Sequence, residues 1–271
     1  NGNLDGFNYE EYLTGAVPGD ADITEPTLTA TGDVSAVQVA TNNGQWIGVF
    51  PPDGTLGTPG GPGGGGATPA TATQVQTATG GATATFAAAA EGNLLVAVVG
   101  MRQETAGVPT MAGGWSLAGS AGGFASDNQT GTRHRVAIFY KVADGGETST
   151  GTVTWTGGGS TGATRVYEFT GAANWGSPST VNTNSAFSER GSIPFTGTVG
   201  ENRLGILAVG SREAMGSPTA AGFTMQNHVA GDVGVATGRV QQASALTVPT
   251  YTITGTNYMS GLIVQFQPTN Q

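Results

Sequence analysis

The sequence contains no cysteine among its 271 residues, and only 10% of them are charged. Without cysteine, neither a disulfide nor a thiolate metal ligand is available. Disorder requires low hydrophobicity with high net charge, and 37% of these residues are hydrophobic. The chain also lacks an apolar run near the ~18 residues of a membrane-spanning helix, and helical periodicity is missing between residues 74 and 268. Frequent glycines and hydroxyl residues instead predict an all-β protein that functions outside the cell or in a virion.

Basic residues are absent from residues 1–53, which carry eight Asp and Glu side chains. From residue 76 onward ten acids face nine bases, so −8 and −1 sum to the net charge of −9. Nucleic-acid binding requires a basic surface, and this distribution disfavours it. An acidic segment favours docking on a basic protein surface, although solvation alone also explains such a charge run.

Glycine is abundant, with 47 residues, or about 17% against a usual ~7%. Between residues 54 and 66 it recurs at every third position. This tract predicts a flexible spacer or, alternatively, a short trimeric or polyproline-like stalk. We therefore expect an acidic attachment segment (1–53), a Gly/Pro-rich linker (54–73) and a β domain (74–271). Within the first segment we expect a helix over residues 6–13 and strands near residues 27–31, 34–39 and 45–50.

An internal repeat fills the third region. Leu94–Arg102 is matched by Leu204–Arg212, and Val166–Phe169 by Ile263–Phe266. Such a repeat predicts two structural units, at about 74–171 and 172–268, that stack to bury a shared face. We predict an antiparallel, jelly-roll-like β-sandwich built from two tandem copies. The repeat pairs Phe86 with Phe195 and Trp115 with Phe223, and these residues are expected at equivalent core positions.

Two strands of this domain have clear patterns. The continuous apolar run Leu94–Val99 predicts a strand covered on both faces. Residues 132–142 alternate, which places Val136 and Ile138 on one face. The other face of that strand carries three cations and is expected to point outward.

The order of motifs at residues 92–97, 112–116, 136–143, 153–157 and 262–268 resembles a duplicated β-sandwich module of tailed-phage virion structural proteins, which is also seen in bacterial surface proteins. The likeness covers roughly residues 75–268. It implies a fibre or decoration protein on a virion surface, outside the cell. A basic capsid or tail protein would then bind residues 1–53. The chain would be a homo-oligomer, and a trimer if the glycine tract forms a stalk.

Few residues suggest catalysis, and we predict no catalytic, cofactor-binding or metal-binding residue. The pattern Gly158–Gly162 matches a nucleophile elbow, but it lies between two expected strands, where we predict a hairpin turn. His134 and His228 lie at non-equivalent places in the two copies. The segment Asp20–Glu25 lacks the Gly and the final Glu of an EF-hand loop.

Four residues are candidates for ligand binding. Arg133, Arg135 and Lys141 share one strand face, where they would contact an acidic glycan or a neighbouring acidic N-terminal segment; the alternative is a solvated face. Trp175, at the junction of the copies, offers a stacking surface for sugars. The predicted function is a non-enzymatic virion-surface protein with an adhesive role toward host glycans. The alternatives are a secreted bacterial carbohydrate-binding or adhesin module and a polysaccharide-active enzyme.

Overall fold

The computed structural model describes residues 37–40, 46–50, 70–103, 108–123, 133–155, 161–185, 190–211, 214–230 and 233–269. Every regular element in these ranges is a β-strand, and the chain divides into two compact units, Asn1–Thr68 and Pro69–Gln271. In the first unit, β1 (Val37–Ala40) pairs with β2 (Trp46–Phe50), which confirms two predicted strands. The helix and the strand expected at residues 6–13 and 27–31 lie outside the described residues.

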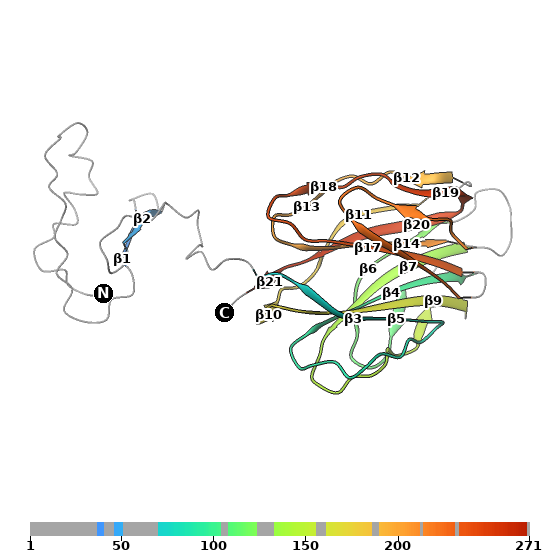
Figure 1. The fold of residues 1–271 in the computed structure, drawn as a ribbon, viewed down its shortest axis with the longest axis horizontal. Helices are drawn as coiled ribbons and strands as arrows, with labels where there is room; N and C mark the ends of the chain where they lie inside the picture. Colours follow the sequence, from blue (N-terminus) through green and yellow to red (C-terminus); the bar gives the residue numbers. More distant parts are fainter. Residues whose placement is uncertain are drawn as a thin grey trace, which may run out of the picture. The chain divides into compact units, whose positions relative to one another are not determined.

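Two five-stranded antiparallel sheets form the middle of the second unit (Figure 1). Sheet 1 has the order β3-β9-β4-β7-β6, with bounds Thr73–Gly80, Thr161–Thr170, Leu94–Gln103, Arg133–Val142 and Ser116–Gly123. Sheet 2 has the order β11-β20-β14-β17-β16, with bounds Ser179–Ser185, Met259–Phe266, Leu204–Ser211, Val233–Val240 and Thr224–Ala230. Counted along the chain, each sheet therefore has its strands in the order first, fifth, second, fourth, third.

Shorter strands lie outside these two sheets. Beside sheet 1, β5 (Pro109–Met111) pairs with β8 (Val153–Trp155). Beside sheet 2 are β12 (Arg190–Ile193), β19 (Tyr251–Asn257), β15 (Pro218–Thr219), β13 (Thr198–Val199) and β18 (Leu246–Thr247). The last pair is β10 (Asn174–Trp175) with β21 (Pro268–Thr269).

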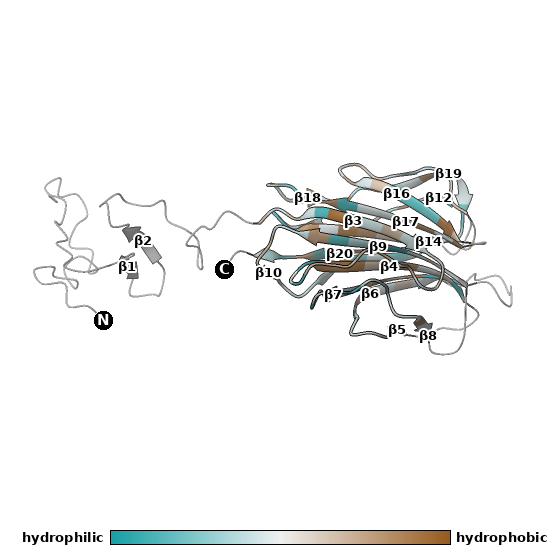
Figure 2. Cartoon of the chain, turned by 60° about the horizontal axis from the view of Figure 1, so that its bottom comes forward, coloured by the Kyte–Doolittle hydropathy of each residue, from teal (hydrophilic) through white to brown (hydrophobic). Residues whose placement is uncertain are grey.

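The main hydrophobic core lies between the two sheets, and each sheet has a second core on its outer face. Strand β4 contributes to two of them, because Leu94 and Val96 point into the central core while Leu95 and Ala97 point into the outer one. Full burial of each such Leu or Val side chain stabilises the fold by about 1.5–3 kcal/mol. The expectation of a strand covered on both faces is confirmed, and in Figure 2 the hydrophobic colour concentrates on central strands such as β4.

The face of β7 that was expected to point outward is instead covered, which corrects the prediction. Ala137 and Phe139 lie on that face and are at most 1% exposed, because Phe86 and Trp115 pack over them in the outer core of sheet 1. The predicted hairpin around residues 158–162 is wrong as well. Strand β8 pairs with β5, whereas strand β9 pairs with β3 and β4. The strands β8 and β9 are therefore not the two arms of a hairpin.

Glycines bring the backbones of the two sheets into contact. A Cβ atom built on Gly100 of β4 would lie 2.9 Å from the Gly234 carbonyl oxygen of β17. A Cβ built on Gly210 of β14 would lie 2.6 Å from the Arg135 carbonyl oxygen of β7. The two contacts are reciprocal, since each sheet offers its second strand to the fourth strand of the other. No residue larger than glycine fits at either point without separating the sheets.

One end of the second unit gathers the start of β3 and the last described strand (Figure 1). The Gln241 side chain accepts a hydrogen bond from the Ala72 amide at 2.7 Å and donates one to the Ala70 carbonyl at 3.0 Å. Gly171 (φ +100°) packs there so closely that a Cβ would lie 2.0 Å from the Thr71 carbonyl oxygen. The β10–β21 pair lies at the same end, so residues 70–72 lie near the last described strand.

Candidate functional site

The three cations predicted as a binding face do not form one patch. Arg135 and Lys141 lie near opposite ends of β7, and the buried residues Ala137 and Phe139 separate them. At ~3.3 Å per residue, the two positions are roughly 20 Å apart. Arg133 is the first residue of β7, and its side chain is outside the described residues.

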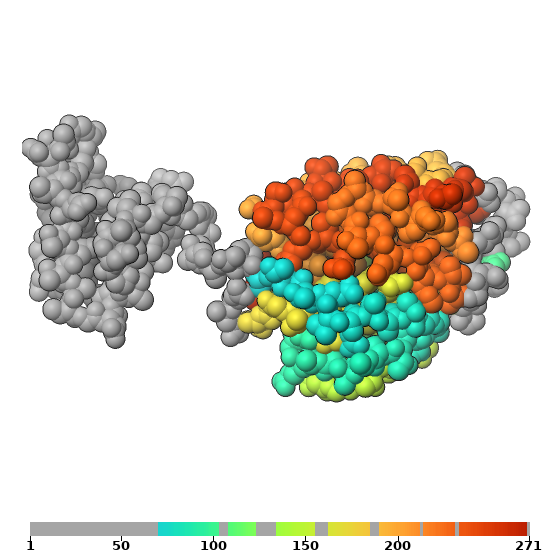
Figure 3. Space-filling model, in the orientation of Figure 1, coloured from blue at the N-terminus to red at the C-terminus, as the bar shows by residue number. Residues whose placement is uncertain are grey.

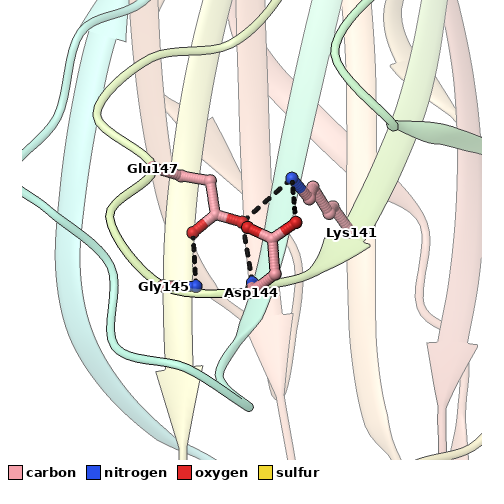
Figure 4. Close-up of polar contacts among 4 residues, drawn as sticks. All are labelled: Lys141, Asp144, Gly145 and Glu147. Atoms are coloured by element: carbon pink, nitrogen blue, oxygen red, sulfur yellow. Dashed lines mark hydrogen bonds and ion pairs between the residues drawn. The ribbon is translucent and has the colours of Figure 1, made fainter.

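Lys141 is held in an ion-pair cluster at the far end of β7 (Figure 4). Its Nζ lies 2.9 Å from Glu147 Oε1 and 3.3 Å from Asp144 Oδ2. Glu147 also accepts hydrogen bonds from the backbone amides of Asp144 at 2.8 Å and Gly145 at 3.1 Å. Burial raises the pKa of Glu147, but hydrogen bonds from the Asp144 backbone amide and from the Lys141 side chain outweigh it and lower the pKa to about 2. The cluster fixes the turn after β7 and occupies the Lys141 ammonium group.

Trp175 lies at the junction of the two halves, as the sequence predicts, but its ring is only partly exposed. It packs against the central core, and its backbone pairs with Pro268 of β21. The indole Nε1 is buried and has no hydrogen-bond partner among the described residues. Part of the ring surface remains available for a ligand, whereas the indole nitrogen is not available.

Glu168 is the one buried carboxylate among the described residues, at 2% exposed. It accepts hydrogen bonds from the Asn93 side chain at 2.5 Å, from the Ala90 amide at 3.1 Å and from the Gln76 side chain. The carboxylate thereby anchors the connection between β3 and β4 to β9.

A neutral amide does the same work in sheet 2. Gln265 has the register position in β20 that Glu168 has in β9. Its side chain accepts a hydrogen bond from the Gly200 amide at 2.8 Å and donates one to Ser179 Oγ at 3.2 Å. Because an uncharged side chain anchors the corresponding loop, the geometry assigns Glu168 a structural role.

A group of polar side chains joins the two sheets where β9 faces β16 and β17. Within this group, here called the polar seam, the Tyr167 hydroxyl shares a hydrogen bond with Thr237 and donates one to Gln226 Oε1 at 3.2 Å. The Arg165 guanidinium donates to Gln226 Oε1 and to the Asn227 carbonyl oxygen, each at 2.9 Å. Neither Arg165 nor its partners were predicted as site residues.

Arg239 of β17 completes the polar seam. Burial raises the pKa of the Tyr167 hydroxyl, against the opposing effects of its hydrogen bond with Thr237 and of the Arg165 and Arg239 charges. The internal repeat contains one sequence difference that could have pointed to the polar seam. Leu262 stands in the second copy at the position that Arg165 has in the first.

The two histidines have structural surroundings. His134 is fully buried, and its ring centroid lies 6.4 Å from that of Tyr258. His228 Nε2 lies 2.9 Å from the Gly80 carbonyl oxygen, which links β16 to the end of β3. Within the described ranges, no three His, Cys, Asp or Glu residues come together as metal ligands. No helix in those ranges is long and apolar enough to cross a membrane.

Comparisons of the chain with protein-family models, with curated proteins and with solved structures found no match.

Proposed function

We propose that the chain is a non-enzymatic surface protein of a virion, a phage fibre or a capsid or tail decoration subunit, that adheres to host-surface glycans. The observation that carries this proposal is the arrangement of the β domain. Its first strand and its last described strand lie at one end, where Gln241 holds residues 70–72. A domain tethered at one end leaves its remaining surface free to face a host cell.

The rigidity of the domain supports the same role. The central hydrophobic core and the close backbone contacts at Gly100 and Gly210 join the two sheets, and an outer core covers each sheet. Close-packed protein interiors have low compressibility and transmit strain, as a projecting virion part requires. In this proposal the two sheets belong to tandem, jelly-roll-like modules that arose by duplication, which accounts for their shared strand order.

Attachment is assigned to the acidic residues 1–53, which bind a basic capsid or tail surface. Their eight acids and lack of bases favour such a partner over nucleic acid. Exposed ionic contacts are screened beyond about 10 Å at 0.1 M salt, so raising the salt should release the protein from virions. Light scattering of the released protein measures whether it is the homotrimer that a stalk beginning at Gly54 would form.

Immunogold electron microscopy with an antibody against residues 70–269 tests the proposal. Labelled virions, together with capsid and tail genes beside the gene, are the expected result. The absence of label from virions made in cells that express the gene contradicts the virion role, and a secretion leader upstream of residue 1 favours a secreted adhesin. A glycan array with the full chain separates adhesion from a purely structural role.

A further inference from the structure

The polar seam contains a buried positive charge that has no negative partner among the described residues. Arg165 is 9% exposed, the lowest value for any described arginine or lysine. Both of its hydrogen bonds end on neutral oxygens, and its buried Nε has no partner in the described part of the chain. Burying a guanidinium without a counter-charge costs several kcal/mol. An anion bound nearby would offset that cost.

A second cation lies at the same place. Arg239 is partly buried and lies on β17 two residues from Thr237, so both side chains are on the strand face where Thr237 bonds the Tyr167 hydroxyl. The charges of Arg239 and Arg165 both act on that hydroxyl. Neither arginine forms an ion pair within the described residues. The seam therefore concentrates two positive charges around one hydroxyl in a chain with a net charge of −9.

Exposed hydroxyl groups border these charges. Thr77 and Thr79 of the edge strand β3 are exposed and pair directly with Tyr167 and Arg165 of β9. Residues paired across antiparallel strands point to the same face, so these threonines lie beside the seam. Figure 3 shows β3, in cyan, next to orange atoms of sheet 2 on one face of the domain. A ligand can thus approach the arginines past two hydroxyl groups, although Thr77 already donates its proton to the Val166 carbonyl oxygen at 3.0 Å and has only acceptor capacity left for a ligand.

Where β20 faces β7, at the equivalent place of the same interface, the two sheets pack without such charges. The residues at the register positions of Arg165, Tyr167 and Arg239 are there apolar or aromatic, namely Leu262, Val264 and Tyr140. Tyr140 packs edge-on against Phe266 at 5.8 Å between ring centroids, and a Cβ built on Gly119 would lie 2.9 Å from Leu262 Cδ1. Because apolar contacts suffice on that side, holding the sheets together does not account for the two arginines.

We propose that the polar seam binds an oxyanion of an acidic polysaccharide, a carboxylate or a sulfate group, with Arg239 and Arg165 supplying the positive charge. The Thr77 and Thr79 hydroxyls hydrogen-bond to the sugar, while the buried Tyr167 hydroxyl keeps its bonds to Thr237 and Gln226 within the seam. Guanidinium groups suit this ligand because their planar fork matches carboxylate and sulfate oxygens. The inference rests on the proposed adhesive function and names the ligand class and the site.

Titration calorimetry on the full chain tests the proposal with four ligands: a glucuronic acid oligosaccharide, a sulfated oligosaccharide, a neutral oligosaccharide and sodium sulfate. We expect an acidic oligosaccharide to bind the wild-type chain at 0.05 M salt and to bind the Arg239→Gln variant with at least tenfold lower affinity. The neutral oligosaccharide should not bind. Arg203→Gln is the matched control, because Arg203 is also partly buried, forms no ion pair within the described ranges and lies away from the seam, beside Gly200. The affinity of this variant should stay within twofold of wild type. Raising the salt to 0.3 M should weaken binding.

The outcomes separate the site from the adhesive role. Equal affinity of wild type and Arg239→Gln for an acidic oligosaccharide overturns the site and leaves adhesion standing. Binding of the neutral oligosaccharide alone overturns the site in the same way. If sodium sulfate binds in an Arg239-dependent manner and no oligosaccharide binds, the polysaccharide is ruled out as the ligand and the seam is a site for small anions. If none of the four ligands binds, both the site and the adhesive function are overturned. Should Arg239→Gln fail to fold, Arg239→Lys, which keeps the charge and loses the fork, must still bind more weakly than wild type.

Discussion

Replacing Gly210 by alanine tests the direct backbone contact between the two sheets. The new Cβ would lie 2.6 Å from the Arg135 carbonyl oxygen and 3.0 Å from Val136 Cβ. An ordinary carbon–oxygen contact is ~3.3 Å, so the sheets must separate locally by roughly 0.7 Å. Overpacking of this kind costs about 2 kcal/mol. The lower entropy of the unfolded chain returns about 0.5 kcal/mol, which leaves a net loss of about 1.5 kcal/mol.

Differential scanning calorimetry of the full chain measures this loss. For a domain of this size, 1 kcal/mol corresponds to roughly 2–4 °C in Tm, so Gly210→Ala should melt about 3–6 °C below wild type. Gly81→Ala is the control, because a Cβ there would meet only the Gly162 carbonyl oxygen, at 3.7 Å. Gly100→Ala should behave like Gly210→Ala. If Gly210→Ala and Gly81→Ala melt within 1 °C of each other, the close packing described for the sheets is refuted.

Three further predictions concern the polar clusters. Glu147 has its pKa lowered to about 2 in the folded chain, below its unfolded value of ~4.3, so its contribution to stability is fully present above pH ~4.3 and is lost as the pH falls toward 2. Glu147→Gln should flatten the pH dependence of the unfolding free energy, measured with denaturant, over this window. An unchanged slope counts against the cluster. Glu168→Ala should cost about 3 kcal/mol by leaving buried donors unsatisfied. Glu168→Gln should cost less than half of that in the same denaturation assay, because Gln265 anchors the corresponding loop; equal losses would contradict that equivalence. Trp175→Phe should change stability by less than ~1 kcal/mol, because it removes a buried donor without a partner; a larger loss would mean that the indole nitrogen is hydrogen-bonded.

The candidate site was only partly accessible to sequence reasoning. Trp175 was found from its place at the junction, and Lys141 from the alternation of its strand. The alternation did not indicate that both faces of β7 are covered, because nothing in the period of one strand reports a second layer. Nor did it place Lys141 beside Glu147, since that contact depends on the turn that follows β7.

The sequence by itself determined the all-β class, the burial of Leu94–Val99 on both faces, and the internal repeat. These properties follow from the hydrophobic period of single strands and from residues near each other in the chain. Only the tertiary structure decided how the sheets face each other and which residues meet between them. Tyr167 and Arg165 contact Gln226 and Thr237, partners 59 to 70 residues away in the sequence. Their meeting depends on the stacking of two whole sheets, which no local pattern encodes.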